Sequence, residues 1–420
     1  FIIYMIKQTQ YIEATSHSNN RTEFTVPKYM CNNFRLIDFG VKTYTPATDR
    51  QYPYGCGALC LIDTITVYDG STIISQSRGV NQFSAFREQC DGASANYSIG
   101  SSLYNNSLNY EPNQTIQINQ TAPTLGAGKE NLTYVDLWKI VPFFLGLDLE
   151  AYNQMRQAVK KGNKKQIKKL VKSANVIPCD KLNLRIVIEY SQLSADLLFH
   201  NGQESDTYDI NRPILCVDKI SGAPSSNDFQ IVYDNYDLEI IKLNGFDANP
   251  GEGTELAEQQ LRLYACDGKF LKDITLVNSA ISAYEGASSF FSGSQFKESM
   301  NIIVNSEKLI PYDLNTPARK QMYLNYSKSN FMTPILSNVY GHGATEDNKL
   351  YGGPNDNASL MTKLNSYLTL TVDQRINQLV LQYQRSTYTN DFQFEPIMMN
   401  CFYTTQRTLN YKNGQMVIAY

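Results

Sequence analysis

The sequence predicts a mainly β protein built from two tandem β-sandwiches, with a few short helices in the connecting loops. Three observations predict this fold class. Short segments rich in β-branched and aromatic residues recur along the chain and are separated by turns rich in Asn, Ser and Gly. With 420 residues the chain exceeds the usual length of one domain, and its 42% hydrophobic share can build a core. Its two halves also share a pair of strand motifs in the same order.

The predicted strands follow one another through the chain. Residues 58–68 and 72–75 flank Asp69-Gly70, a strong hairpin signal, so we expect them to pair. Many short strands joined by polar turns are typical of sandwiches and jelly rolls. The other segments with strand character are 34–44, 184–190, 213–220, 229–233, 238–243, 260–264, 273–277, 368–372, 378–383, 396–402 and 415–420.

One stretch, residues 149–173, has helical spacing instead. Its apolar residues Tyr152, Met155 and Val159 lie three and four positions apart, and a further apolar group follows Gly162-Asn163. The spacing predicts two short helices separated at that glycine. Tyr152, Met155 and Val159 are expected to form the buried stripe of the first helix.

The chain is predicted to divide near its midpoint. Residues 221–228, rich in Ser, Gly, Pro and Asn, form the best linker. We therefore expect a first domain over 1–220, including an N-terminal arm, and a second over 229–420. In the first, 186–190 precede a Pro-Ile strand at 213–216, and in the second, 379–383 precede a Pro-Ile strand at 396–400. A weaker similarity links 65–70 with 281–286, and together these matches indicate a tandem duplication.

Composition excludes several classes of protein. The net charge is −3, and the pI of about 5.8 does not fit a basic nucleic-acid binder. No run of about 18 apolar residues predicts a membrane-spanning helix. The first ten residues make a poor signal peptide, and Met5 is the expected natural start, which leaves residues 1–4 of uncertain origin. The eight dispersed cysteines are expected to be mostly reduced thiols of an intracellular product.

No motif predicts catalysis, a cofactor or a metal. The three histidines, His17, His200 and His342, have no neighbours at metal-ligand or triad spacing. The segment 125–129 looks like a phosphate loop, but Pro123 and Glu130 occupy positions where that loop needs Gly and Ser or Thr. We therefore predict no catalytic residue, no cofactor-binding residue and no metal ligand.

One charged segment stands out within the predicted helices, because between 156 and 172 it carries eight basic residues and no acidic one. The ordinary interpretation is a solvated lysine face. The alternatives are a contact with an acidic neighbouring subunit, with nucleic acid or with an inner membrane, and any such contact would be salt-sensitive and sequence-nonspecific. The residues are Arg156, Lys160, Lys161, Lys164, Lys165, Lys168, Lys169 and Lys172.

Several strand patterns carry a family resemblance. They are 62–74 with the following 80–86, 184–190 with 212–218, and 379–385. In these segments the chain resembles the double jelly-roll major capsid proteins of icosahedral double-stranded DNA viruses. That group contains adenovirus hexons and the virophage and Polinton-like capsid proteins. The chain lacks the long insertions that form hexon towers, so the resemblance does not extend to an elaborate outer decoration.

The resemblance implies two tandem eight-stranded jelly-roll sandwiches and a structural role without enzymatic activity. Three subunits would present six rolls as a pseudo-hexagonal capsomer of an icosahedral shell. The implied partners are further copies of the chain, then penton and minor capsid or cement proteins. The implied location is the virion, assembled inside the host cell. Three alternatives stay open: a carbohydrate-binding β-sandwich or viral attachment protein, a β-sandwich glycan hydrolase, and a single-jelly-roll capsid protein with long insertions.

Overall fold

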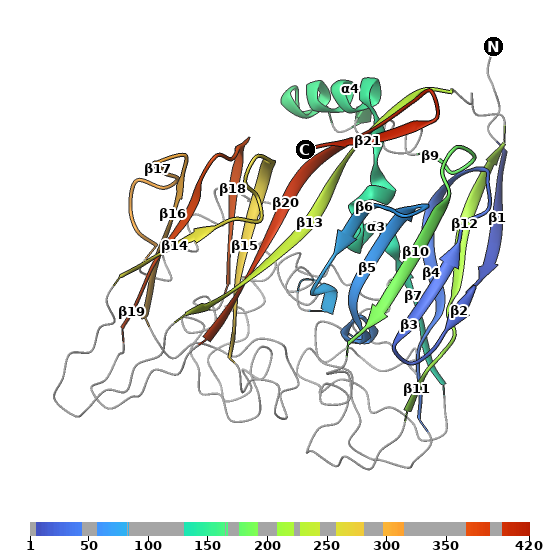
Figure 1. The fold of residues 1–420 in the computed structure, drawn as a ribbon, viewed down its shortest axis with the longest axis horizontal. Helices are drawn as coiled ribbons and strands as arrows, with labels where there is room; N and C mark the ends of the chain where they lie inside the picture. Colours follow the sequence, from blue (N-terminus) through green and yellow to red (C-terminus); the bar gives the residue numbers. More distant parts are fainter. Residues whose placement is uncertain are drawn as a thin grey trace.

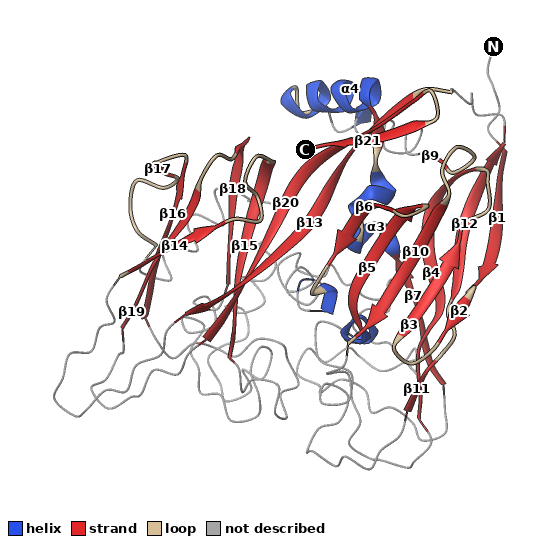
Figure 2. Ribbon diagram, in the orientation of Figure 1, coloured by secondary structure: helices blue, strands red, loops and turns tan. Residues whose placement is uncertain are grey.

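The protein is mostly β-strand, and its helices lie between two groups of strands (Figures 1 and 2). Most of the described helical residues belong to one connection in the chain, between residues 137 and 160. The computed structural model describes residues 6–43, 57–81, 83, 130–163, 165–166, 176–191, 208–221, 227–243, 258–280, 297–314, 367–386 and 397–420.

Eight strands from the first half of the sequence build two sheets around a common core. One sheet has the order β1-β12-β4, with β7 also pairing β4, and the other has the order β3-β10-β5-β6. Three short strands extend these sheets: β2 (Ser16–His17), β9 (Ile177–Pro178) and β11 (Tyr208–Ile210). The eight main strands are β1 (Ile6–Glu13), β3 (Arg21–Thr25), β4 (Met30–Thr43), β5 (Ile62–Asp69), β6 (Thr72–Ser77), β7 (Glu130–Asp136), β10 (Leu184–Tyr190) and β12 (Ile214–Ser221).

The second half repeats this construction. One sheet has the order β18-β15-β20-β13 and the other β14-β19-β16-β17. The short strands β8 (Leu147–Asp148) and β21 (Gln415–Ala419) extend the first of these sheets. The eight main strands are β13 (Phe229–Leu243), β14 (Gln259–Leu263), β15 (Phe270–Ala280), β16 (Lys297–Val304), β17 (Glu307–Lys308), β18 (Tyr367–Arg375), β19 (Leu379–Ser386) and β20 (Ile397–Lys412).

The two halves have the same topology. When the main strands of each half are numbered one to eight along the chain, both halves read 1-8-3-6 in one sheet and 2-7-4-5 in the other. Two four-stranded sheets connected in this way form a jelly roll, so the protein consists of two of them. The paired motifs noted in the sequence occupy the seventh and eighth strands of each roll. The weaker match at 281–286 lies outside the described residues, and β16 holds the fourth position that β5 holds in the first roll.

The structure corrects several predicted strand boundaries. Residues Gly57–Leu61 form a 3₁₀ turn, η1, rather than the start of β5. The two strands predicted at 229–233 and 238–243 are one continuous strand, β13, and β20 continues ten residues past the predicted end at 402. Strands β1, β3, β7 and β16 are not predicted by the sequence pattern. The sequences of β1, β3 and β7 mix polar and apolar residues without a β-branched run, and β16 has such a run only in its last three residues, 302–304.

The hairpin predicted at Asp69-Gly70 is present. Gly70 has a φ of +56° and joins β5 to β6, whose ends pair at Asp69 and Thr72. In the second roll the equivalent hairpin joins β16 to β17 through Asn305 and Ser306, which both have positive φ angles. Two-residue loops with positive φ match the twist of the strands that they connect. The same position in both rolls therefore carries a two-residue turn, with a positive φ at one central residue in the first roll and at both in the second.

The helices α3 (Leu137–Ile140), η2 (Pro142–Leu145) and α4 (Leu149–Lys160) all lie in the connection between β7 and β10. The first predicted helix is thus confirmed, and it ends before Gly162, whose φ is +64°. The second lies almost wholly outside the described residues. The predicted buried stripe is partly wrong: Ala151 and Ala158 are buried, whereas Val159 is 58% exposed because it lies one position off that face.

Candidate functional site

The joint between the two rolls combines hydrogen bonds, an ion-pair network and apolar packing. It forms where β6, the last strand of a first-roll sheet, meets β13 of the second roll. The strands do not share a hydrogen-bonded ladder. Instead, side chains from β13 bond the free backbone edge of β6: Tyr233 Oη donates to the Ile74 carbonyl at 2.8 Å, and the Gln76 amide donates to Asn235 Oδ1 at 3.2 Å.

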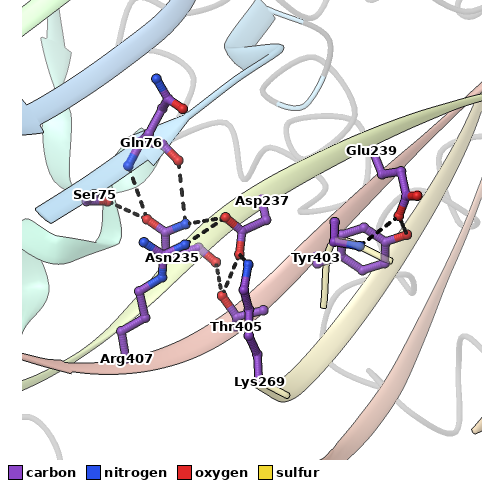
Figure 3. Close-up of polar contacts among 10 residues, drawn as sticks. Ser75, Gln76, Asn235, Asp237, Glu239, Lys269, Tyr403, Thr405 and Arg407 are labelled. Carbon is purple, nitrogen blue, oxygen red and sulfur yellow. Dashed lines mark hydrogen bonds and ion pairs between the residues drawn. The ribbon is translucent and has the colours of Figure 1, made fainter. Parts of the chain in front are cut away.

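Asn235 acts at this edge as a substitute for a neighbouring strand (Figure 3). Its Oδ1 accepts from Ser75 Oγ at 2.7 Å as well as from the Gln76 amide, and its Nδ2 donates to the Gln76 carbonyl at a long 3.5 Å. The side chain is fully buried. Edge strands invite pairing with other chains unless they are covered. One amide side chain therefore satisfies both backbone groups of Gln76.

A carboxylate holds Asn235 in position. Asp237 accepts from Asn235 Nδ2 at 2.9 Å and from Arg407 Nη2 at 2.7 Å through one oxygen (Figure 3). Its other oxygen accepts from Lys269 Nζ at 3.1 Å and from Thr405 Oγ1 at 2.9 Å. The Arg407 side chain is only 8% exposed, so this is a largely desolvated ion pair that depends on its hydrogen-bonded neighbours. The network fixes the rotamer that Asn235 needs.

Apolar contacts complete the joint. The ring of Phe83, just after β6, stacks on Phe402 with a centroid distance of 4.8 Å and meets Tyr236 edge-on at 4.7 Å. A Cβ on Gly79 would lie 3.0 Å from Leu238 and 3.3 Å from Phe402. Gly79 also has a φ of +59°, so both space and backbone favour glycine there. The absence of a side chain at Gly79 lets Leu238 and Phe402 of the second roll pack directly against the first-roll backbone.

The core of the first roll continues across this joint. Its cluster of buried residues includes Ile231, Tyr233, Phe402 and Leu409 from the β13–β20 ribbon of the second roll. The second roll has its own separate cluster around Leu276, Ile302 and Leu381. Because buried residues of both rolls pack into one cluster, the shared core holds the two rolls together.

The connection that carries the helices also braces the two rolls. Its strand β8 pairs with β13 at Ile231 and Val232, and the Tyr152 hydroxyl on α4 donates to Gln406 at 2.7 Å.

A cavity of about 240 Å³ remains between α4, η2 and β13. On its wall Lys272 lies 2.6 Å from Asp234. Burial lowers the pKa of Lys272, but the Asp234 carboxylate outweighs this effect and raises the pKa above its ordinary value.

The predicted basic site lies on α4 and just beyond its end. Asp148 caps the helix by accepting from the Ala151 amide at 2.9 Å. Cations near a helix C-terminus interact favourably with the helix dipole, which supports the ordinary interpretation of part of this cluster. Four of the eight predicted residues lie outside the described part of the chain: Lys164, Lys168, Lys169 and Lys172. The other four are exposed: Arg156, Lys160, Lys161 and Lys165.

His17 and the cysteine pair Cys31 and Cys179 also have structural partners. His17 lies 2.7 Å from Thr22 Oγ1 through Nδ1 and 2.9 Å from the Ile210 carbonyl through Nε2, so it links β2 to β3 and β11. Cys31 and Cys179 are fully buried with their sulfurs 3.1 Å apart. Burial raises the pKa of Cys179 well above its ordinary value. Across the described ranges no cluster of three or more His, Cys, Asp or Glu side chains could hold a metal ion, and no helix is long and apolar enough to cross a membrane.

Several solved viral capsid structures share this architecture. PBCV-1 VP54, fitted into a reconstruction of the virophage Sputnik, aligns with a TM-score of 0.59 over 100% of this chain and 98% of its own. A PBCV-1 capsid structure gives the same values, and the Sputnik virophage structure gives 0.56 over 100% and 89%. The sequence identity is 10% in each case. The chain shares the double jelly-roll fold with these structures. No protein-family model and no curated protein matches the sequence.

Sequence reasoning misses the residues that build the joint. The run Asp234-Asn-Tyr-Asp237 favours a break between two strands, since its residue types are typical of a turn. In the double jelly roll it lies in the middle of β13 and supplies Asn235 and Asp237. The useful signal is alternation: Tyr233, Asn235 and Asp237 occupy every second position, which places them on one face of a strand.

Proposed function

We propose that this protein is a major capsid protein, three copies of which form a pseudo-hexagonal capsomer of an icosahedral virus shell. The observation that carries the proposal is the repeated roll: two jelly rolls of the same topology are joined by a shared core into one block. Three such blocks present six rolls around one axis. The similarity of fold to PBCV-1 and Sputnik capsid structures supports the same conclusion.

Such a protein acts through burial and self-association, so its function requires no catalytic group, cofactor or metal. Its partners are copies of itself, in the capsomer and between capsomers, together with penton and minor capsid or cement proteins. Its location is the virion, after assembly inside the host cell. The chain divides into a first roll over 1–220, a linker over 221–228 and a second roll over 229–420. The short strand β8 reaches across that division.

We further propose that the basic face of α4 contacts an anionic surface during assembly. Arg156, Lys160, Lys161 and Lys165 are exposed and lie at the end of a helix that projects beside the joint (Figure 1). Lysine neutralises phosphate without reading bases, so the contact with nucleic acid would be sequence-nonspecific. A salt titration of DNA binding tests this proposal.

The test of the capsid function is the assembly state of the purified chain. Three copies of the 47.6 kDa chain amount to about 143 kDa, so sedimentation is expected to show a species of that mass. Negative-stain images should show compact particles with a six-lobed outline. A chain that stays monomeric at every accessible concentration, with isolated two-lobed particles, would contradict the proposal.

A further inference from the structure

Two cysteines from distant parts of the first roll are in contact through their sulfurs. Cys31 lies in β4, and Cys179 directly follows β9, 148 positions later in the chain. Their Sγ atoms are 3.1 Å apart, and both side chains are fully buried in the first-roll core. Among the cysteines that the structure describes, this is the one sulfur–sulfur contact. The others are also buried: Cys216, Cys266 and Cys401.

A tight turn at the end of β9 produces this contact. Cys31 lies opposite Ile177 in the β4–β9 pairing, so Cys179 is two positions past the residue that faces Cys31. Such diagonal neighbours lie about 7–8 Å apart in a regular antiparallel ladder. Here the Cys179 amide donates to the Ile177 carbonyl at 2.9 Å, which folds the chain back toward β4. The backbone at this turn therefore holds the two sulfurs together.

The cysteine pair lies where the helix-bearing connection returns to the first roll. Strand β9 is only two residues long and pairs with β4 at two positions. One of its residues, Pro178, has no backbone N–H to donate to the ladder. The same connection braces the second roll through β8 and α4. A covalent bond between Cys31 and Cys179 would secure the returning end of this brace.

The pair is buried, but its neighbours along the chain reach the surface. Tyr29, Met30 and Asp180 are half-buried. Burial, and then the nearness of Cys31 and Cys179, raise the pKa of Tyr29 to about 12, so Tyr29 lies beside the sulfurs. Burial also raises the pKa of the Cys179 thiol well above its ordinary value. Because the thiolate is the reactive form, oxidation of the folded chain requires a local opening at β9 and is slow.

We propose that Cys31 and Cys179 form an intramolecular disulfide when the chain meets a small disulfide of the glutathione class. One cysteine, as its thiolate, attacks the small disulfide, forms a mixed disulfide and releases one small thiol. The other cysteine then attacks the mixed disulfide and releases the second small thiol. Two protein thiols are thus oxidised to one disulfide, the small disulfide is reduced to two thiols, and the two protein protons pass to the released thiolates.

This bond is an exception to the expectation of mostly reduced cysteines. The reducing pool inside cells opposes disulfides, whereas virion surfaces and extracellular media permit them. The buried pair stays reduced during folding and becomes oxidised afterwards, which closes the loop of chain between residues 31 and 179. Closing a long loop stabilises the folded state by restricting the unfolded chain. The bond does not depend on the proposed capsomer, so each can fail without the other.

Peptide mapping of the full chain tests the bond directly. The reduced protein is incubated with oxidised glutathione, alkylated and digested, and a linked peptide that contains both Cys31 and Cys179 is expected. Because the pair is buried, a second sample is refolded from urea in a mixture of reduced and oxidised glutathione. Every thiol is accessible at the start of that refolding, and native packing then selects the pair.

Thermal unfolding measures what the bond contributes. The oxidised wild type is expected to unfold about 5 °C or more above the same protein treated with a reductant. Cys31→Ala removes one partner and should abolish this difference. Cys401→Ala is the matched control and should retain the difference, because Cys401 is equally buried but belongs to the core of the second roll. Each variant is compared with itself, oxidised and reduced, so a loss of packing cancels.

The outcomes divide clearly. A linked peptide that forms slowly in the native sample and readily on refolding supports the bond and its buried position. Its absence from both samples, a main linkage of Cys31 or Cys179 to another cysteine, or an unchanged thermal shift in Cys31→Ala would overturn the proposal. Sedimentation of the oxidised and reduced wild type is scored separately: if neither forms trimers, the capsomer proposal fails and the disulfide stands on its own result.

Discussion

The first strands of the two rolls, β1 and β13, hold the same topological position but differ in length and surroundings. β1 has 8 residues and pairs with an 8-residue β12, whereas β13 has 15 residues and pairs with a 16-residue β20. The outer face of β1, which carries Tyr11, is exposed. That of β13 is partly covered, because Tyr236 and Leu238 pack against the first-roll core while Ile240 is 53% exposed.

The additional length of the second ribbon is what makes the joint. Ile231, Tyr233 and Asn235 lie in the first half of β13, and Leu409 lies opposite Ile231 on β20. They contact β8, β6 and the core of the first roll. The comparison shows that a repeated fold acquired its internal contact by extending one ribbon. We therefore expect changes at the joint to affect folding, and changes at the free β1 face to leave folding stability almost unchanged.

The largest expected effect comes from truncating a large apolar side chain in the joint. Phe402→Ala removes a side chain that is 2% exposed and packs on Phe83, and it should lower the free energy of unfolding by about 4 kcal/mol. Tyr11→Ala on the free face should change it by less than about 0.5 kcal/mol. Urea unfolding of both variants measures the difference, and equal destabilisation would remove the contrast between the two strands.

A smaller effect is expected from the polar part of the joint. Asn235→Ala leaves the Ser75 hydroxyl and the Gln76 amide without their partner in a buried site, which should cost about 2–3 kcal/mol. It should also speed hydrogen exchange of the Gln76 amide. Asn301→Ala is the control, because Asn301 is equally buried but bonds Ile310 within the second roll. Unchanged exchange at Gln76 in Asn235→Ala would show that the amide does not seal the β6 edge.

The sequence predicted most of the fold because a strand in a sandwich core leaves a local signature. The strand at 184–190 alternates between the buried core and the surface, and its apolar residues are visible without knowing the partner strand. The duplicated motif in the seventh and eighth strands is recognisable for the same reason. A double architecture was therefore predictable from local patterns.

The joint was not predictable in this way because the structural role of its residues depends on a partner strand far away in the chain. Asn235 and Asp237 are typical turn residues until β6, about 160 residues earlier, is placed beside them. The later half of β20 lacks a hydrophobic run, and its strand structure comes from pairing with β13. The basic cluster on α4 is visible as a run of charge, but sequence could not show which surface it faces.

The dependence of folding stability on alkaline pH gives a further test of the joint. Burial raises the pKa of Tyr233 above its ordinary value of 10.0, so the native state holds the proton more tightly than the unfolded chain does. Stability should thus be unaffected by this group below about pH 10 and should fall above it, by about 1.4 kcal/mol per pH unit for each such tyrosine. The pKa values of Tyr190 and Tyr403 are raised by burial in the same direction.

Tyr233→Phe separates the two contributions of that hydroxyl. At neutral pH the variant should lose about 1 kcal/mol of stability, because the Ile74 carbonyl no longer has its donor. Above pH 10 its stability should fall less steeply than that of the wild type, because one fewer buried phenol titrates. Denaturant unfolding from pH 7 to pH 11 measures both effects. Parallel alkaline slopes for the two proteins would show that Tyr233 does not ionise on unfolding.

The smallest effect on folding is expected at α4, which belongs neither to the sealed joint nor to the free β1 face. Replacing Arg156, Lys160, Lys161 and Lys165 with Gln should change stability by less than about 1 kcal/mol, because these side chains are exposed and only the favourable interaction of Lys160 and Lys161 with the helix dipole is lost. If they bind phosphate, DNA affinity should fall, and its slope against log salt should flatten by about 0.9 for each phosphate that the variant no longer neutralises. A variant with the same charge change at scattered exposed positions, Lys28, Lys242, Arg375 and Lys412, controls for net charge. An equal fall in affinity in both variants would show that charge acts through the whole surface, and the α4 face would then be an ordinary solvated face.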